Sequence, residues 1–493
     1  MTQKSTAVVA CLMLVLLPIC AKSQLGGVVS ATNQFEYSYS LETDREIVEN
    51  WLDVSYQFGG FRTGLTYDIQ QPSEEGDRFN GINQLFFEFA TGPFDVRVGT
   101  FYGLFGRGLV FASYEDRLVR VNTSLEGVIA STYLGRFNGT VFTGAYEAKD
   151  KDVRGADLTY DLGRSWNIGT TVMTYDTVTP PNPDNKLNRE WIAAGRLWKY
   201  FSWSDLYFEY GWKKGYDLEA ENDFDFRNGH ALYGNWNLFA GPVGLSLEAK
   251  DYEDFSILPR DDGKPPLNNP PTTTREHIYT LLARKTLQVD PNDEVGGQSE
   301  LTVSGTSWTL VGNASRTEDH EGNILYAEGY SHLALDDIGP FRLVGAYAYQ
   351  DVAYENEGYN NTLIGDLTIF FSDTHSLELV YEFQHTKLGS SELPDGILDL
   401  GAYDTQFFNF QFAIAPKWNF AALLELDNKH PLQRAFGEKE GPFPAFQIAY
   451  TIPSGGALTL WAGKRQAGQV CVGGVCKNEP AFEGIEFFGI IRY

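Results

Sequence analysis

The chain has 493 residues, of which 43% are hydrophobic and 14% aromatic, and its 65 Asp and Glu against 38 Lys and Arg give a formal net charge of −27 at pH 7. A chain this acidic disfavours nucleic acid and anionic membrane faces as partners. Its aromatic content fits the two interfacial girdles of a membrane β-barrel, or alternatively a carbohydrate-binding β-protein.

The N-terminus has the features of a secretory signal peptide. A lysine and an apolar run, within residues 4–19, precede a small-residue motif at residues 21–23. This order predicts removal of residues 1–23 and leaves residues 24–493 as one mature domain. A lipoprotein modified at Cys20 is the weaker alternative, because the residue before it is isoleucine rather than a small residue.

From residue 27 onward the sequence repeats one unit, in which two alternating segments meet at a short turn and a long polar connection follows. An apolar/polar period of two indicates β-strands. Regular alternation of short and long connections is typical of an outer-membrane barrel. We therefore expect an all-β fold, a transmembrane antiparallel up-and-down β-barrel. The long connections are expected at residues 70–81, 103–126, 177–190, 213–229, 254–276, 387–403 and 430–442.

The two faces of the expected strands differ in polarity. In residues 377–384, Leu, Leu, Tyr and Phe alternate with Glu, Val, Glu and Gln. One face therefore suits lipid and the other suits a water-filled lumen.

Strand counting gives 25 candidates, whereas bacterial barrels have an even number. The conflict lies in residues 277–308, because segments 277–287, 296–303 and 308–315 cannot all be placed with consistent direction. We expect about 24 strands, with 26 as the alternative. Patterning begins near residue 27, so no N-terminal plug domain is expected, and energised uptake by this chain alone is excluded.

Residues 103–126 form the best candidate for a pore constriction. The segment is long but too apolar for a free external loop, and it carries arginines beside carboxylates. Folded inward, it would narrow the pore and set its selectivity; a hairpin packed on itself outside the membrane is an equal alternative. The candidate residues are Arg107, Tyr114, Glu115, Asp116, Arg117 and Arg120.

The sequence gives only weak indications of a metal site or a catalytic site. Glu219, Glu221, Asp223 and Asp225 could hold a divalent cation, but their spacing misses the EF-hand pattern and acidic loops are usually solvated. The seven histidines are scattered and no catalytic motif is present. We expect no cofactor, no metal and no enzymatic activity.

Two cysteines remain after processing, Cys471 and Cys476. Five residues apart in an oxidising compartment, they are expected to form a disulfide. A metal site would need two further ligands nearby.

The last stretch, residues 481–493, alternates as a strand that ends on Tyr493. A terminal strand this complete is expected to pair on both edges and close the barrel against the first strand. It resembles the C-terminal strand that the assembly machinery of bacterial outer-membrane proteins reads, although Phe488 stands where a glycine is usual.

Three motifs resemble an uncharacterised family of outer-membrane barrels from Bacteroidetes and Chlorobi. The first runs from Gly106-Arg107-Gly108-Leu109 to Tyr114-Glu115-Asp116. The second runs from Asn269-Pro270-Pro271 through Arg275-Glu276-His277 to Tyr279-Thr280-Leu281-Leu282. The third joins the Cys471–Cys476 segment to Pro480-Ala481-Phe482-Glu483-Gly484. The resemblance implies fold and location but no activity, and it assigns no role to Glu276 or His277.

These observations favour a porin-like barrel in the outer membrane of a Gram-negative bacterium. We expect passive diffusion of small solutes with cation preference. The alternative is a non-conducting, loop-plugged barrel that serves as a surface receptor, anchor or scaffold. The expected partners are outer-membrane lipid, the assembly machinery and small solutes, and not nucleic acid.

Overall fold

The computed structural model describes residues 26–74, 76–146, 151–177, 188–216, 226–257, 266–353, 357–393, 396–399, 401–430, 440–453, 455–472 and 475–493. The expected signal peptide and the acidic residues Glu219, Glu221, Asp223 and Asp225 lie outside this part of the chain. No helix within it is long and apolar enough to cross a membrane.

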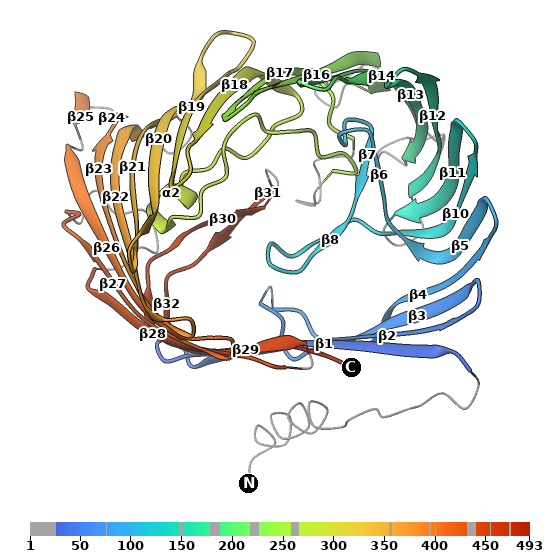
Figure 1. Ribbon diagram of the computed structural model, residues 1–493. Coiled ribbons are helices and arrows are strands. Elements are labelled where there is room, and N and C mark those ends of the chain that lie inside the picture. Colours follow the sequence, from blue (N-terminus) through green and yellow to red (C-terminus); the bar gives the residue numbers. More distant parts are fainter. Residues whose placement is uncertain are drawn as a thin grey trace.

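Twenty-four strands form one closed antiparallel barrel, which confirms the expected fold class and strand number. Each strand pairs with its neighbours in chain order around the wall (Figure 1). The wall strands are β1 (Val28–Ser40), β2 (Arg45–Phe58), β3 (Phe61–Gln70), β4 (Phe79–Thr91), β5 (Phe94–Phe101), β10 (Leu125–Leu134), β11 (Phe137–Tyr146), β12 (Lys151–Gly163), β13 (Trp166–Thr177), β14 (Asn188–Tyr200), β15 (Ser204–Tyr216), β16 (Phe226–Ala240), β17 (Val243–Glu253), β18 (Asp293–Ser304), β19 (Trp308–Glu318), β20 (Ile324–Ile338), β21 (Phe341–Val352), β22 (Glu357–Ser372), β23 (His375–Leu388), β26 (Ala402–Ile414), β27 (Trp418–Asp427), β28 (Phe443–Thr451), β29 (Gly456–Arg465) and β32 (Phe482–Arg492).

The remaining elements lie in the connections. They are the hairpins β6 (Gly103–Phe105) with β7 (Phe111–Ser113), β8 (Glu115–Asp116) with β9 (Val121–Asn122), β24 (Ser390–Leu393) with β25 (Gly396–Asp399), β30 (Gly468–Val472) with β31 (Val475–Glu479), and the one-turn helix α2 (Thr280–Ala283).

The strand candidate at residues 277–287 was wrong. This segment contains α2, in which the adjacent residues Leu281 and Leu282 are both buried. Adjacent buried residues do not alternate between faces as strand residues do. Removing this candidate lowers the count from 25 to the observed 24, and the connection after β17 extends to residue 292 rather than 276.

The last strand closes the barrel as expected, because β32 pairs with both β29 and β1. Phe35 of β1 lies opposite Gly489 of β32, and its ring centre is 5.0 Å from that of Phe487. A Cβ atom on residue 489 would lie 2.3 Å from the Phe35 ring. Glycine at this position therefore leaves room for the Phe35 ring at the closing seam.

The outward face is apolar, as predicted from the alternation. On β21, Leu343, Tyr347 and Tyr349 are more than 40% exposed, while Val344 and Ala348 between them are buried. The inward face is less polar than expected, because apolar inward residues lie beneath connections that fold into the lumen. These connections all leave the same end of the barrel, and every connection at the other end has at most four residues.

Candidate functional site

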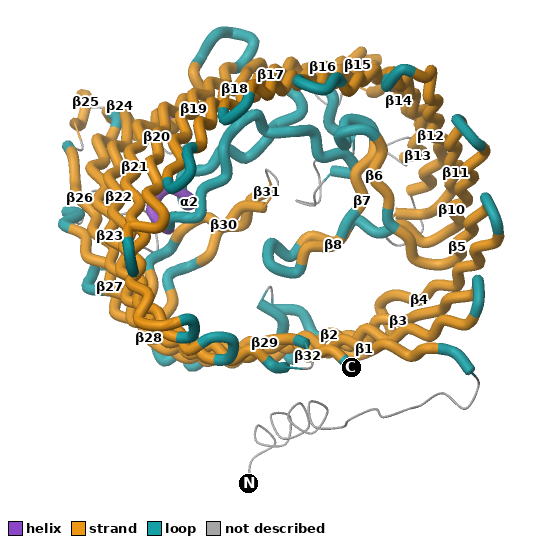
Figure 2. The backbone as a smooth tube through the Cα atoms, viewed as in Figure 1, coloured by secondary structure: helices purple, strands orange, loops and turns teal. Residues whose placement is uncertain are grey.

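Three long connections fold into the lumen and, with the shorter connection between β3 and β4, form the candidate site (Figures 1 and 2). The first inward segment is residues 102–124 and carries β6 to β9. The second is residues 254–292 and carries α2, with residues 258–265 outside the described chain. The third is residues 466–481 and carries β30 and β31.

The β6–β7 hairpin of the first segment belongs to a buried apolar cluster. Phe105, Leu109 and Phe111 are at most 8% exposed, and the rings of Phe105 and Phe111 pack on Phe142 of the wall at centre distances of 5.5 and 4.8 Å. The cluster extends to the second segment through Phe255. Burial on this scale fixes the hairpin against the wall.

Asn268 joins the first two inward segments. Its side-chain amide donates to the backbone oxygens of Leu109 and Phe255 at 3.1 and 2.9 Å, and its Oδ1 accepts from the Ile257 amide at 3.0 Å. The Ala112 amide also donates to the Leu267 oxygen. The two segments therefore form one internal body on this side of the lumen.

The tip of the β6–β7 hairpin contacts the wall through its backbone. The Arg107 amide donates to Oε2 of Glu209 on β15 at 2.9 Å. A Cβ on residue 106 would lie 2.4 Å from the Glu209 carboxylate, and Gly106 has a φ of +59°. Glycine is required here both for the turn and for the close approach. The exposed Arg107 guanidinium lies 5.0 Å from the Tyr207 ring centre.

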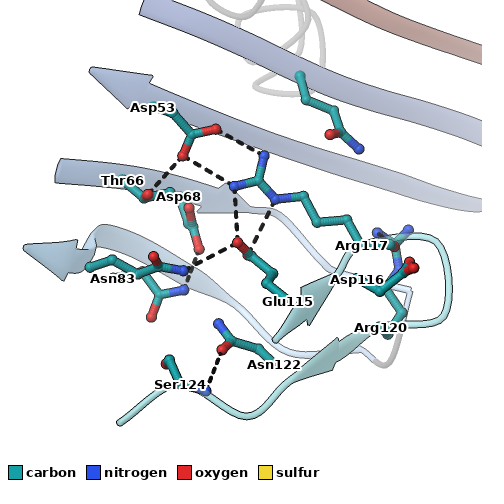
Figure 3. Close-up of polar contacts among 12 residues, drawn as sticks. Asp53, Thr66, Asp68, Asn83, Glu115, Asp116, Arg117, Arg120, Asn122 and Ser124 are labelled. Atoms are coloured by element: carbon teal, nitrogen blue, oxygen red, sulfur yellow. Dashed lines mark hydrogen bonds and ion pairs between the residues drawn. The ribbon is translucent and has the colours of Figure 1, made fainter. Parts of the chain in front are cut away.

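The β8–β9 hairpin is held to the wall by ion pairs. Arg117 binds Asp53 of β2 with two contacts of 3.1 Å and its neighbour Glu115 with an Nε–Oε1 distance of 3.2 Å (Figure 3). The Thr66 hydroxyl on β3 donates to Asp53 at 2.7 Å. Such two-pronged arginine–carboxylate contacts fix orientation as well as distance.

Arg120 binds three carboxylates, which come from β1, β2 and the connection between β3 and β4. Its Nη2 lies 2.5 Å from Glu36 and 2.6 Å from Glu49, and its Nε lies 3.2 Å from Glu74. Arg120 has a φ of 58°, a backbone conformation that costs about 1 kcal/mol or more for a residue with a side chain. The three ionic contacts offset that cost.

Trp51 on β2 lies beneath both arginines. Its ring centre is 5.4 Å from Arg117 Cζ and 5.2 Å from Arg120 Cζ, within the range of cation–π attraction. Burial by itself lowers the pKa of each guanidinium, but the surrounding carboxylates more than offset this and the pKa of both arginines is raised. Both arginines therefore stay charged.

The other residues predicted in this segment have different positions. Burial raises the pKa of Tyr114 to about 12, and its amide donates to Thr123 Oγ1. Asp116 Oδ1 accepts from the amides of Leu118 and Val119, which shapes the turn. The structure brings Glu115 and Arg117 together, whereas Arg107 lies on the other hairpin and Asp116 makes no ion pair among the described residues.

The second inward segment contacts a series of carboxylates that point into the lumen from successive parts of the wall. Arg275 binds Glu300 of β18, and His277 Nε2 lies 2.7 Å from Glu328 Oε2 of β20. The Thr280 and Leu281 amides donate to Glu382 of β23 at 2.9 and 2.8 Å. Glu382 therefore caps the N-terminus of α2, where free amides favour an anion.

The segment ends at Arg284, whose Nη1 and Nη2 bind Glu425 of β27 at 2.8 and 2.9 Å. Beside it lies the third inward segment, where a Cβ on residue 468 would be 3.0 Å from Arg284 Cδ. Arg465 binds Glu486 of β32 at 2.6 Å. In the β30–β31 hairpin, Cys471 and Cys476 are directly opposite in register; their side chains lie outside the described atoms, so the disulfide stays a prediction.

One cavity of about 960 Å³ lies among the three inward segments and the wall strands β1, β2 and β32. Its lining contains both arginines and glutamates. The charged lining residues are Glu36, Glu42, Glu49, Glu74, Glu276, Glu486, Arg45, Arg117, Arg120, Arg284, Arg465 and His277. No three His, Cys, Asp or Glu side chains in the described ranges are placed to hold a metal ion directly.

Sequence reasoning missed the wall residues that hold the inward segments. Asp53, Glu49, Glu328, Glu382 and Glu425 all stand at inward positions, which alternation alone identifies as facing the lumen. Their partners lie many strands away in the chain, so no spacing pattern could name them.

Solved structures similar to this chain are outer-membrane barrels and their complexes. One is a chain of the E. coli P pilus tip assembly intermediate PapC-PapD-PapK-PapG, with a TM-score of 0.53 and 7% identity over 94% of this chain and 60% of that one. The siderophore receptor PirA from Pseudomonas aeruginosa gives 0.46 and 9% over 94% and 80%, and opdK from the same organism gives 0.34 and 9% over 95% and 98%.

At these identities the likeness shows the fold alone, and the chain spans about 60% of the pilus-assembly chain. No curated protein matches the sequence. A model described as a family of unknown function (DUF6029) matches residues 8–321 and 342–489, so the chain belongs to that family.

Proposed function

We propose that the chain is an outer-membrane channel for passive diffusion of small solutes, and that the tip of the β8–β9 hairpin, residues 115–122, is its constriction. The observation that supports this most is the 960 Å³ cavity between the inward segments. Its volume is at the upper end of small-molecule sites. A lumen narrowed to this size would admit one small solute at a time and would exclude folded protein.

The cavity lining also bears on selectivity. Six glutamates face five arginines in the lining, so the fixed charges nearly balance there. The chain as a whole is strongly acidic, and the remaining field favours cations. We therefore propose a weak cation preference.

The barrel would be placed in the outer membrane of a Gram-negative bacterium, with its short turns in the periplasm and its long connections outside. The exposed apolar outer face would contact lipid. The paired terminal strand β32 is the segment that the assembly machinery would read. The bacterial group named by the sequence resemblance stays a prediction.

A second function is favoured by the way the lumen is filled. The first two inward segments share a buried apolar core, and the wall carboxylates Glu382 and Glu425 bind the second segment. Both segments are therefore held against the wall. In a non-conducting barrel the same cavity would be a ligand pocket of a surface receptor or scaffold.

Planar-bilayer recording of the refolded mature protein separates the two functions. A channel gives stable conductance steps, with a reversal potential slightly on the cation side under a salt gradient. The double variant Arg117→Ala/Arg120→Ala should raise the step size about twofold, since it releases the constriction.

Arg154→Ala is the matched control, because Arg154 pairs with Asp152 on an exposed part of β12. It should leave the steps unchanged. A folded, heat-modifiable barrel that stays silent in the bilayer would contradict the channel and favour the receptor.

A further inference from the structure

A second, smaller cavity lies beside the first, between the β8–β9 hairpin and the wall strands β2 to β4. Its volume is about 170 Å³. Its polar lining is almost entirely oxygen-bearing, and Figure 3 shows several of these side chains pointing toward one another. The polar lining residues are Glu49, Asp68, Gln70, Ser73, Asp77, Asn83, Glu115, Asp116, Arg117, Arg120 and Asn122.

Negative charge is in excess around this cavity. Its lining has five carboxylates, Glu49, Asp68, Asp77, Glu115 and Asp116, against the two guanidinium groups of Arg117 and Arg120. Asp68 makes no ion pair with any described residue. Five carboxylates against two guanidinium groups leave a formal excess of three negative charges in the lining.

Asp68 is the most deeply buried aspartate of this cavity. The residue is 2% exposed and lines the cavity. Its Oδ2 accepts a hydrogen bond from Asn83 Nδ2 at 2.6 Å, whereas its Oδ1 is buried without a hydrogen-bond partner among the described residues. A buried carboxylate oxygen without a partner is costly. Crowded carboxylates relieve this cost either by taking up a proton or by binding a cation.

The size of the cavity decides how a cation would be held. No three carboxylates converge closely enough to serve as direct ligands in the described structure. The cavity has room for roughly five water molecules. Mg²⁺ keeps most of its water in protein sites, and Ca²⁺ accepts mixed sets of carboxylate, amide and water oxygens. The amide oxygens of Asn83 and Asn122 add neutral oxygen ligands to the carboxylates of the lining.

We propose that this side cavity binds one hydrated divalent cation, Mg²⁺ or Ca²⁺, with Asp68 as its principal anionic contact. The bound ion offsets the charge excess and joins the β8–β9 hairpin to β3. The site is independent of solute passage, because the ion binds equally in a conducting and in a plugged barrel.

Isothermal titration of MgCl₂ and of CaCl₂ into the refolded, chelator-treated mature protein tests the site at constant ionic strength. We expect a class of binding with a Kd on the order of 10⁻⁴–10⁻³ M. Asp68→Asn should weaken this class at least tenfold. The apparent Tm at a fixed scan rate should rise by about 2–4 °C at saturation in the wild type only.

Asp366→Asn is the matched control, since Asp366 is an inward aspartate on β22 that is 5% exposed. It makes the same chemical change on another part of the wall and should leave the binding class intact. Asp77 is exposed and lines the cavity, so Asp77→Asn is expected to fold and to weaken binding severalfold even if Asp68→Asn fails to refold.

Binding that is unchanged in Asp68→Asn and Asp77→Asn, or no binding in the wild type at neutral pH, overturns the proposal. The second result would mean that protonation alone satisfies the cluster.

Discussion

Arg284 of the second inward segment and Glu425 of β27 form a two-pronged ion pair, with both nitrogen–oxygen distances below 3 Å. The Arg284 side chain is 21% exposed and that of Glu425 only 6%. The chain that leaves β17 thus crosses the lumen and is anchored on a strand far around the barrel. Arg284 also packs beside Gly468, so one side chain links two inward segments to the wall.

Loss of this ion pair should loosen the second inward segment. Glu425→Gln removes the negative charge but keeps the shape, and we expect it to cost about 1–3 kcal/mol, the range for a charge-assisted hydrogen bond that is mostly buried. Limited proteolysis between residues 266 and 292 should become faster. Glu378→Gln removes the same charge from an inward position on β23 and should not change the cleavage rate. Equal cleavage in both variants would contradict the anchoring role.

Asn268 should matter more to stability than its single side chain suggests. It is 1% exposed and makes three hydrogen bonds that join the first two inward segments. Asn268→Ala leaves buried backbone groups without partners, so we expect a loss of about 2–4 kcal/mol in urea unfolding followed by tryptophan fluorescence. Asn323→Ala changes an exposed turn residue and should cost about 0.5 kcal/mol. Similar losses in the two variants would rule out the joining role.

A pH-dependent contact is expected at the turn after β19. His320 Nδ1 lies 2.6 Å from Asp293 and its Nε2 lies 3.1 Å from Asp251. Burial by itself lowers the pKa of His320. The two carboxylates raise it by more than burial lowers it, so the pKa lies above the ordinary value of 6.5. The stabilisation is therefore fully present below pH 6.5 and is lost as the pH rises through the folded pKa.

His320→Asn tests this contact. The free energy of unfolding should fall at pH 5.5 by less than about 1 kcal/mol, because the pair is partly exposed, and should be unchanged at pH 9. His375→Asn is the control, since His375 bonds to the hydroxyls of Ser372 and Thr374. If His320→Asn still lowers the free energy of unfolding at pH 9, the shape of the histidine rather than its charge stabilises the contact.

The predicted disulfide is testable by mass. Cys471 and Cys476 are opposite one another in the β30–β31 register, which is compatible with a bond that closes a six-residue loop. The mature protein should show no maleimide-reactive thiol before reduction and two after it. Cys471→Ser/Cys476→Ser should still form a closed barrel, because neither residue belongs to the 24-strand sheet. Two reactive thiols in the unreduced protein would disprove the bond.

Much of the wall could be predicted from sequence because its information is local. Alternation identifies strands and faces, and the short turns fix which strands are neighbours. The single wrong strand, residues 277–287, was wrong for a tertiary reason. Its apolar pair Leu281 and Leu282 packs inside the barrel, and Glu382 supplies the cap that a four-residue helix lacks on its own. Helices this short form only with such outside contacts.

The sequence by itself determined that this chain is an antiparallel barrel of about 24 strands closed by its last strand, since period-two patterning and connection length are properties of neighbouring residues. Only the tertiary structure decided what fills the barrel. The partners Arg117 and Asp53, Asn268 and Leu109, and Arg284 and Glu425 are 64, 159 and 141 residues apart. Such pairs meet because the wall curves around to bring distant inward faces together, and no pattern along the chain records that curvature.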